Sequence, residues 1–200
     1  MAKQQPQNQP EQEQQPKLSG ADALKVDLYF WLQALVMALV VLILLFTFVG
    51  RIIGVDGSSM VPTLHDGDLL LLQSIGYTPE QGDVVVLTKD FANYVGQPIV
   101  KRVIATGGQT VEIDYDAGVV YVDGVALDEP YINEPMRRPG AAEMDVDSVT
   151  VPEGCIYVLG DNRNNSTDSR HRDLGVIDNR YVLGRALCIL LPFQDFGPIE

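Results

Sequence analysis

One long apolar run dominates the first quarter of the chain. Residues 28–50 contain no charged side chain, and Gln33 and Thr47 are the only clearly polar ones. As a helix, residues 28–49 would extend about 33 Å at 1.5 Å per residue, enough to cross a bilayer core of about 30 Å. Aromatic residues crowd the N-terminal end of the run at positions 29–31, as in an interfacial belt. The pattern predicts a single transmembrane helix.

Two other interpretations of this run are weaker. A cleaved signal peptide has an apolar region of about 7–15 residues followed by a small-x-small site, and this run is longer and lacks such a site. A buried helix of a soluble protein would be amphipathic, and this one is not. Lys17 and Lys25 precede the run and Arg51 follows it, a mild positive-inside bias. We therefore expect a single-pass protein of the cell membrane with a cytoplasmic N-terminus.

The residues before the run have the composition of a disordered tail. Residues 1–20 hold seven Gln and three Pro and almost nothing apolar, so they cannot bury enough surface to offset the entropy of ordering. The expected organisation is a disordered cytoplasmic tail (1–27), a transmembrane anchor (28–50) and an extracytoplasmic β-rich domain (51–200). A short inserted hairpin is expected near 119–127 in that domain.

After residue 55 the pattern changes to short β-type runs separated by turn signals such as Asp-Gly and Gly-Gly. No strong helical period and no internal repeat appear there. The predicted strands are 69–72, 84–87, 99–104, 111–113, 119–122, 156–159 and 184–191. Residues 132–150 are predicted to be an exposed loop. Many short strands with regular turns indicate a mainly β fold, a coiled antiparallel sheet or β-barrel-like domain.

Composition narrows the function classes. The net charge of the 200-residue chain is −13, which argues against binding nucleic acid and against tight electrostatic docking on anionic lipid. Cys155 and Cys188 both lie in apolar stretches, and we favour two small buried side chains over a disulfide. No CxxC motif or His/Cys cluster indicates a metal, and no cofactor is expected.

A serine and a lysine are the best candidates for chemistry. Ser59 lies in a turn-like segment, Gly57 to Leu64 (Gly-Ser-Ser-Met-Val-Pro-Thr-Leu), and Lys101 lies in a run of β-branched residues. Either residue alone is weak evidence, because turn serines and strand lysines are common. Burial would lower the lysine pKa, however, and a neutral lysine can take the proton of a serine hydroxyl. The chain has only two histidines to offer as an alternative base.

The polar segment Gly160 to Arg170 (Gly-Asp-Asn-Arg-Asn-Asn-Ser-Thr-Asp-Ser-Arg) has three interpretations. It could be a plain surface loop. It could be a calcium loop with oxygens from Asp161, Asn165 and Asp168, although the glycine and final glutamate of an EF-hand are missing. It could also support the lysine, with one hydroxyl to orient it and an acid–arginine pair to fix the loop.

Together these segments resemble the bacterial type I signal peptidases, membrane-anchored serine proteases. The resemblance spans about residues 25–195 and depends on four segments in the order found in that family. They are 57–64, 82–86 (Gly-Asp-Val-Val-Val), 100–108 (Val-Lys-Arg-Val-Ile-Ala-Thr-Gly-Gly) and 160–170. The segment 160–170 is the most specific of the four. The order of the four segments, after a membrane anchor, makes the resemblance more specific still.

The resemblance implies a role for each matching residue. Ser59 would be the nucleophile and Lys101 the general base. Ser166 would hydrogen-bond the lysine, Asp168 and Arg170 would form a structural ion pair, and Arg102 would join that network. Some relatives use a hydroxyl two positions before the nucleophile as an oxyanion donor; here that position is Gly57, so the second donor is unidentified.

It also implies the substrates: signal peptides of secreted preproteins, with small residues at positions −1 and −3 before the cut. The expected pocket is shallow and apolar and is formed by Val55, Met60, Leu64 and Val100. The peptide would bind as an added strand beside 99–104. The expected partners are these peptides, the lipid bilayer and, in passing, the secretion machinery.

Two other functions remain open from sequence. A membrane-anchored β-domain could present the acidic loop to a partner without catalysis. A self-cleaving Ser-Lys protease of the SOS-repressor kind would share the dyad, but those proteins are cytoplasmic and carry a DNA-binding part, against the anchor and the charge found here.

Overall fold

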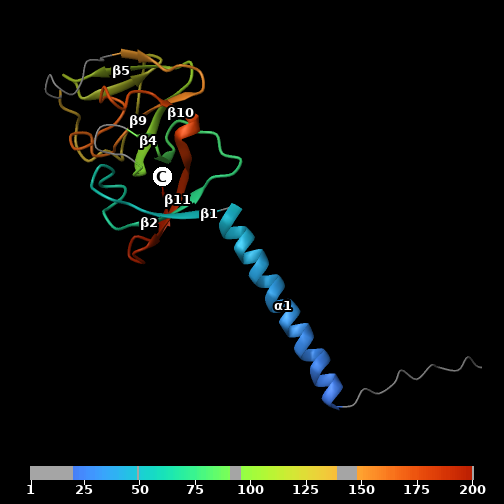
Figure 1. Ribbon diagram of the computed structural model, residues 1–200. Helices are drawn as coiled ribbons and strands as arrows, with labels where there is room; N and C mark the ends of the chain where they lie inside the picture. The colour runs from blue at the N-terminus through green and yellow to red at the C-terminus, as the bar shows by residue number, and fades with distance from the viewer. Residues whose placement is uncertain (1–19, 49, 91–95, 139–147, 200) are drawn as a thin grey trace, which may run out of the picture. The chain divides into compact units, whose positions relative to one another are not determined.

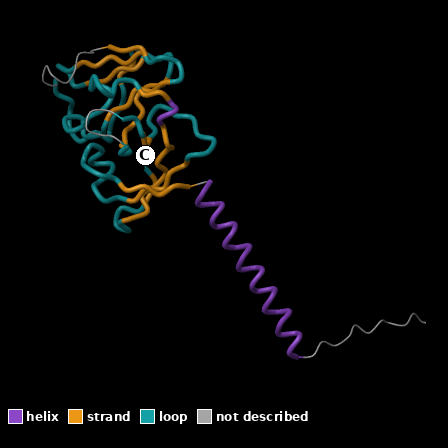
Figure 2. Tube along the Cα trace, in the orientation of Figure 1, coloured by secondary structure: helices purple, strands orange, loops and turns teal. Residues whose placement is uncertain are grey.

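The computed structural model describes residues 20–48, 50–90, 96–138 and 148–199. The chain divides into two compact units, residues 1–43 and 44–200, and each is described by itself. The first contains most of one helix. The second holds the strands, which are joined by many turns and loops (Figures 1 and 2).

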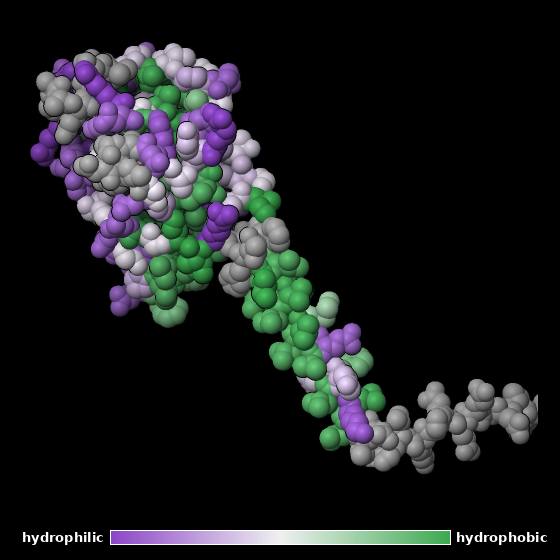
Figure 3. Space-filling view, viewed as in Figure 1, coloured by the Kyte–Doolittle hydropathy of each residue, from purple (hydrophilic) through white to green (hydrophobic). Residues whose placement is uncertain are grey.

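Helix α1 spans Gly20–Phe48. Within it, Leu24–Leu44 is long and apolar enough to cross a membrane, and none of this stretch is buried within the protein. In Figure 3 the C-terminal half of the helix is mostly green (hydrophobic), and purple and pale residues interrupt the green toward its N-terminal end. The helix begins eight residues before the predicted start of the anchor, so residues 20–27 are not part of a disordered tail. Ala, Leu and Lys in that stretch are good helix formers and extend the apolar helix backwards. Residues 1–19 lie outside the described part.

The second unit holds two antiparallel sheets. The larger has the order β1-β2-β11-β3-β4-β9-β10, with β12 paired to β11, and the smaller has the order β7-β6-β5-β8. The strands are β1 (Gly50–Gly54), β2 (Leu69–Gln73), β3 (Val84–Leu87), β4 (Ile99–Thr106), β5 (Thr110–Asp114), β6 (Val119–Val122), β7 (Val125–Ala126), β8 (Ser148–Thr150), β9 (Cys155–Leu159), β10 (Ile177–Asp178), β11 (Val182–Leu191) and β12 (Gly197–Pro198). A 3₁₀ turn, η1 (Asn179–Tyr181), precedes β11. The mainly β, coiled antiparallel fold predicted from sequence is confirmed.

The local predictions succeeded where runs were apolar and failed where they were short. Strands β1, β8, β10 and β12 were not predicted, because two to five residues with glycines or polar side chains give no clear alternation. The hairpin forms as expected, with Asp123 and Gly124 both at positive φ between β6 and β7. The prediction of an exposed loop over 132–150 was wrong in part. Met136 is buried, and residues 148–150 pair with β5 because three alternating residues suffice on a sheet edge.

Strand β4 has an open edge at one end. It pairs with β3 through Ile99 to Arg102, but its pairing with β9 begins only at Arg102. On the side of β9, residues Ile99 to Lys101 therefore have no strand beside them among the described residues. A half-paired strand leaves backbone donors and acceptors available to an extended peptide.

Candidate active site

Ser59 lies in the loop between β1 and β2. Two backbone hydrogen bonds close this loop, from Val55 N to the Asp68 carbonyl at 2.8 Å and from Gly67 N to the Val55 carbonyl at 3.0 Å. Met60 and Leu64, four residues apart, are fully buried and anchor the loop in the core. Burial of these two side chains therefore fixes the backbone beside Ser59.

Lys101 reaches Ser59 from strand β4. Its Nζ is 2.7 Å from Ser59 Oγ and 2.9 Å from the Val100 carbonyl oxygen, with a hydrogen bond to each. The lysine is only 3% exposed. Burial lowers the pKa of Lys101 from 10.5 to about 8, although the carboxylates of Asp168 and Asp161 oppose the shift. The pair predicted from sequence is therefore within hydrogen-bond reach, and with this pKa about half of the amine is neutral near pH 8.

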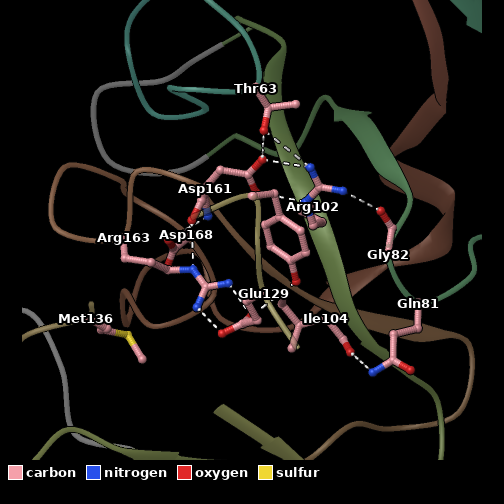
Figure 4. Close-up of polar contacts among 12 residues, drawn as sticks. Thr63, Gln81, Gly82, Arg102, Ile104, Glu129, Met136, Asp161, Arg163 and Asp168 are labelled. Carbon is pink, nitrogen blue, oxygen red and sulfur yellow. Dashed lines mark hydrogen bonds and ion pairs between the residues drawn. The ribbon is translucent and has the colours of Figure 1, made fainter. Parts of the chain in front are cut away.

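Arg102 projects to the other side of β4, since neighbouring strand residues point to opposite faces. Its Nε and Nη2 donate to the two oxygens of Asp161 at 2.9 and 2.8 Å, and its Nη1 donates to the Gly82 carbonyl (Figure 4). The guanidinium also stacks on the Tyr131 ring, 3.9 Å from the centroid. Arg102 was expected to join the network of Asp168 and Arg170; the ion pair that the structure describes for it is with Asp161.

The 160–170 segment holds the serine loop from the other side. Asn162 N donates to the Ser59 carbonyl at 3.0 Å, Asn162 Nδ2 donates to the Ser58 carbonyl at 3.0 Å, and Asn165 Nδ2 donates to Ser58 Oγ at 2.9 Å. The approach is so close that a Cβ on Gly160 would lie 2.5 Å from the Ser59 carbonyl oxygen and would also clash with Ser166. Only glycine fits there.

Two buried ion pairs brace this segment. Arg170 Nε and Nη2 donate to Asp168 at 2.8 and 2.9 Å, and Gly160 N donates to the same carboxylate at 3.0 Å. Burial alone would raise the pKa of Asp168, but the Arg170 guanidinium and these hydrogen bonds hold it below its usual value. Arg163 makes a two-pronged contact with Glu129 (Figure 4). The predicted Asp168–Arg170 contact is thus present and buried.

Ser166 lies at the site without the contact that was expected for it. The Lys101 amine bonds to Ser59 and Val100, and no hydrogen bond joins it to Ser166 in the described structure. The Ser166 hydroxyl oxygen is buried against Gly160. In this geometry the Lys101 amine is held by two acceptors, Ser59 Oγ and the Val100 carbonyl oxygen, and Ser166 is neither of them.

The four predicted pocket residues share one hydrophobic cluster. Val55, Met60, Leu64 and Val100 are all buried in it, at 8, 1, 0 and 8% exposure. Of these four, Val100 lines the open cleft, and the other three lie in the layer of packed side chains.

The cleft has a volume of about 670 Å³ and contains both Ser59 and Lys101. Residues from three segments line it: 56–59, 99–101 and, in the third, 163–167 with Arg170 and His171. Arg137 and Arg138 complete the lining. Because Ile99 to Lys101 and Ser59 all line the cleft, an extended chain bound beside this part of β4 would pass the hydroxyl and the amine together.

The calcium interpretation of residues 160–170 does not fit the contacts. Asp161 is paired with Arg102 and Asp168 with Arg170, so each carboxylate already has a cationic partner. Among the described residues, no cluster of three or more His, Cys, Asp or Glu side chains could hold a metal ion. Cys155 and Cys188 are both free and half-buried.

Sequence reasoning missed two supports of the site. Glu129 pairs with Arg163 across 34 positions, and Thr63 Oγ1 donates to Asp161 across 98. The motif at 160–163 marks Asp161 and Arg163 as unusual. A local sequence pattern cannot, however, identify contact partners that lie so far away in the chain. Only the tertiary contacts identify them.

A family model and several known proteins are similar to this chain. The family model described as signal peptidase, peptidase S26, matches residues 28–191. Signal peptidase I of Bacillus licheniformis is 36% identical over 178 residues, which cover 86% of this chain and 92% of that protein. The protein named "Probable signal peptidase I-1" of Synechocystis sp. is 38% identical over 173 residues, covering 82% of this chain and 83% of that protein. A crystal structure of a signal peptidase I from Enterococcus faecalis V583 has 32% sequence identity and a TM-score of 0.43, and covers 55% of this chain and 97% of that one.

Proposed function

The chain belongs to the signal peptidase family, peptidase S26, and from this premise we propose that it cleaves signal peptides from exported preproteins with Ser59 and Lys101 as its catalytic dyad. The observation that carries the proposal is the hydrogen bond of 2.7 Å between a buried amine and a serine hydroxyl in an open cleft. Family membership supports the substrate class, and the contact supports the roles of the residues.

The chemistry is acyl transfer. The neutral Lys101 amine takes the Ser59 proton as Oγ attacks the peptide carbonyl, and the resulting ammonium returns a proton to the leaving amine. A water molecule, activated by the same amine, then hydrolyses the ester. The lowered pKa of Lys101 suits this role, because a base with a pKa of about 8 is partly unprotonated at neutral pH yet still basic enough to accept a proton.

The tetrahedral intermediate needs donors for its oxyanion. We assign one to the backbone N–H of Ser59. Gly57 carries no hydroxyl, and its own N–H donates to Asp66 Oδ1 at 2.8 Å, so it is already committed to the loop. The second donor is left open.

The substrate would lie as an extended strand along Ile99 to Lys101, which have no strand beside them on one side among the described residues. We propose that small residues at −1 and −3 are preferred because the surface beneath them is already filled. Val100 lines the cleft, and Val55, Met60 and Leu64 are packed in the same buried cluster, so we expect little room for a side chain there. A large side chain there would overlap packed atoms.

Helix α1 is proposed to be the membrane anchor of residues 28–50, with a cytoplasmic N-terminus and residues 51–200 as the extracytoplasmic protease domain. Such an anchor would keep the dyad at the membrane surface, where an inserted signal peptide exposes its cleavage site. Ser166, Asp168 and Arg170 would hold the loop behind the dyad, and Arg102 would do so through Asp161.

Incubation of the purified full-length protein with a preprotein, read by mass spectrometry, tests the proposal. The wild type is expected to cut once, after a small-x-small sequence, and Ser59→Ala is expected to leave the preprotein intact while retaining the circular dichroism and melting temperature of the wild type. Cleavage by Ser59→Ala at the wild-type rate would refute the dyad. A folded wild type that cuts no preprotein would favour a non-catalytic binding module.

A further inference from the structure

The loop that carries the proposed nucleophile holds a second hydroxyl. Ser58 directly precedes Ser59 in the chain, and both residues line the cleft together with Lys101. Ser58 is exposed, so its hydroxyl is accessible from the cleft. The Lys101 amine is hydrogen-bonded to Ser59 Oγ and to the Val100 carbonyl oxygen. The proposed acyl transfer therefore gives the Ser58 hydroxyl no role so far.

Asn165 fixes this hydroxyl in place. Its Nδ2 donates to Ser58 Oγ at 2.9 Å, and its backbone N–H donates to the Asn162 carbonyl at 2.9 Å, which holds Asn165 within the 160–170 segment. An amide nitrogen only donates, so Ser58 Oγ is the acceptor in this contact and keeps its own O–H to donate elsewhere. Within the described part of the chain, the structure gives that O–H no acceptor.

The backbone beside this hydroxyl is fixed as well, and it holds a second free donor. The Ser58 carbonyl oxygen accepts from Val61 N at 3.2 Å and from Asn162 Nδ2 at 3.0 Å. The Ser59 carbonyl oxygen accepts from Asn162 N at 3.0 Å. The Ser59 N–H has no acceptor among residues 20–48, 50–90, 96–138 and 148–199, so it is available to an oxyanion, as the proposed function requires.

Covalent geometry keeps these two free donors close together. The donors of an oxyanion hole each lie about 3 Å from one oxygen, so they are at most about 6 Å apart. Four bonds separate Ser58 Oγ from Ser59 N, which keeps the two atoms within about 5 Å of each other in every rotamer. They are therefore close enough to share one acceptor. Gly57 offers no alternative, since it has no side chain and its N–H donates to Asp66 Oδ1 at 2.8 Å.

We propose that the Ser58 hydroxyl is the second oxyanion donor and that Asn165 positions it. This inference rests on the proposed function and supplies the donor that was left open there. As Ser59 Oγ attacks, the carbonyl oxygen of the scissile peptide gains negative charge, and the Ser58 O–H donates to it. Because the charge develops only in the transition state, the hydroxyl contributes to kcat and hardly to KM.

The test compares the full-length wild type with Ser58→Ala and Ser58→Thr in non-ionic detergent, on one preprotein peptide. Ser58→Ala is expected to lower kcat by about ten- to a hundredfold and to leave KM nearly unchanged. This is less than the roughly 10²–10³ lost with a well-shielded oxyanion donor, because water can partly replace an exposed hydroxyl. Ser58→Thr keeps the hydroxyl and should keep most of kcat.

A peptide aldehyde of the same sequence separates oxyanion binding from substrate binding. Ser59 Oγ forms a bond to the aldehyde carbon, the C=O π bond breaks, and the serine proton passes to Lys101, so the aldehyde oxygen becomes the anion of a tetrahedral adduct. In Ser58→Ala the inhibition constant of this aldehyde should rise by the same factor as kcat falls, because both depend on the same O–H donor.

Two further variants test the positioning role. Asn165→Ala should lower kcat several-fold in the wild type and have no further effect in Ser58→Ala, because Asn165 acts only through the hydroxyl. Ser148→Ala is the matched control, since Ser148 is an exposed serine of β8 that does not line the cleft. It should keep the kcat and the aldehyde inhibition of the wild type. Circular dichroism and melting temperature check that each variant is folded.

A wild-type kcat in Ser58→Ala would overturn this inference and leave the proposed function standing. A raised KM in Ser58→Ala, with kcat and aldehyde inhibition unchanged, would make Ser58 a contact of the bound substrate and would also overturn it. Losses that add up fully in the Ser58 and Asn165 double variant would refute the role of Asn165. A wild type that cuts no peptide would overturn the proposed function and this inference with it.

Discussion

Lys101 and Arg102 are consecutive residues of one strand and both are almost fully buried. Their surroundings differ, because the charge of Arg102 is stabilised by a carboxylate in direct contact and that of Lys101 is not. Arg102 donates to both oxygens of Asp161 and stacks on Tyr131. Lys101 bonds only to a hydroxyl and a backbone carbonyl, both neutral acceptors, and carboxylates act on it at longer range.

The difference shows how one strand can serve both structure and chemistry. A buried cation that contacts a carboxylate stays charged and braces the fold. A buried cation without such a contact loses its proton more easily, because the apolar surroundings disfavour the charge. The alternation of side chains along β4 keeps the two environments on opposite faces, a few ångströms apart.

The largest expected effect comes from removing the amine. Lys101→Met should lower kcat/KM for a preprotein peptide by roughly 10²–10⁴, which is what general-base catalysis contributes in rate. Steady-state kinetics measures this.

The same variant should be more stable than the wild type at pH 7. The folded-state pKa of Lys101 is lowered from 10.5 to about 8, so the folded protein binds fewer protons than the unfolded chain and the wild type gains stability as pH rises from 8 to 10.5. At pH 7 the ammonium costs on the order of 3 kcal/mol, at 1.36 kcal/mol per pKa unit. Urea unfolding at pH 7 and pH 10 measures the difference, which should shrink at the higher pH. A less stable variant at pH 7 would contradict the comparison with Arg102.

The second effect concerns the structural side of the comparison. Asp161→Asn should lower the free energy of unfolding by about 3–5 kcal/mol, because it leaves Arg102 buried beside a neutral amide. Urea denaturation measures the loss. The double variant R102M/D161L should recover most of it, since two apolar side chains leave no unpaired charge. If Asp161→Asn and R102M/D161L lower the free energy of unfolding by the same amount, the ion pair is not the main interaction that holds Arg102.

The third prediction concerns pH. Because the base must be neutral, kcat/KM should rise about tenfold per pH unit below pH 8 and level off above it, so that the value at pH 6 is about a hundredfold below the plateau. The rate of acylation in single turnovers measures the profile. A midpoint near 10, the value of a solvent-exposed lysine, would show that burial does not act on the amine as inferred.

The smallest effect is a shift of that midpoint. Asp168 is the carboxylate that raises the pKa of Lys101 most, so Asp168→Asn should move the midpoint of the pH profile below 8. Loss of the carboxylate also leaves Arg170 unneutralised, and its charge acts in the same direction. Asp178→Asn, which breaks the exposed pair with Arg180, is the control and should leave the midpoint unchanged. A shift to higher pH in Asp168→Asn would contradict the electrostatic argument.

The sequence predicted most where its signals were local or motif-like. The apolar helix, the central strands and the hairpin at Asp123-Gly124 follow from hydrophobic runs and turn residues. The pairing of Ser59 with Lys101 followed from the resemblance of ordered segments. Helix residues 20–27, the short strands and the burial of Met136 were missed, because propensity is weak over a few residues and tertiary packing decides there.

By itself, the sequence determined that this protein has an anchor-like helix, a mainly β domain, and a serine and a lysine with the right chemistry. Only the tertiary structure decided which charges meet. Glu129 with Arg163, Asp161 with Arg102, and the hydrogen bond from Arg137 N to Asn164 Oδ1 all join residues far apart in the chain. Such contacts depend on how strands pair and loops close, and no periodicity in the sequence records them. For the same reason the lowered pKa of Lys101 could be expected from its neighbours, but its approach to Ser59 could be measured only in the folded chain.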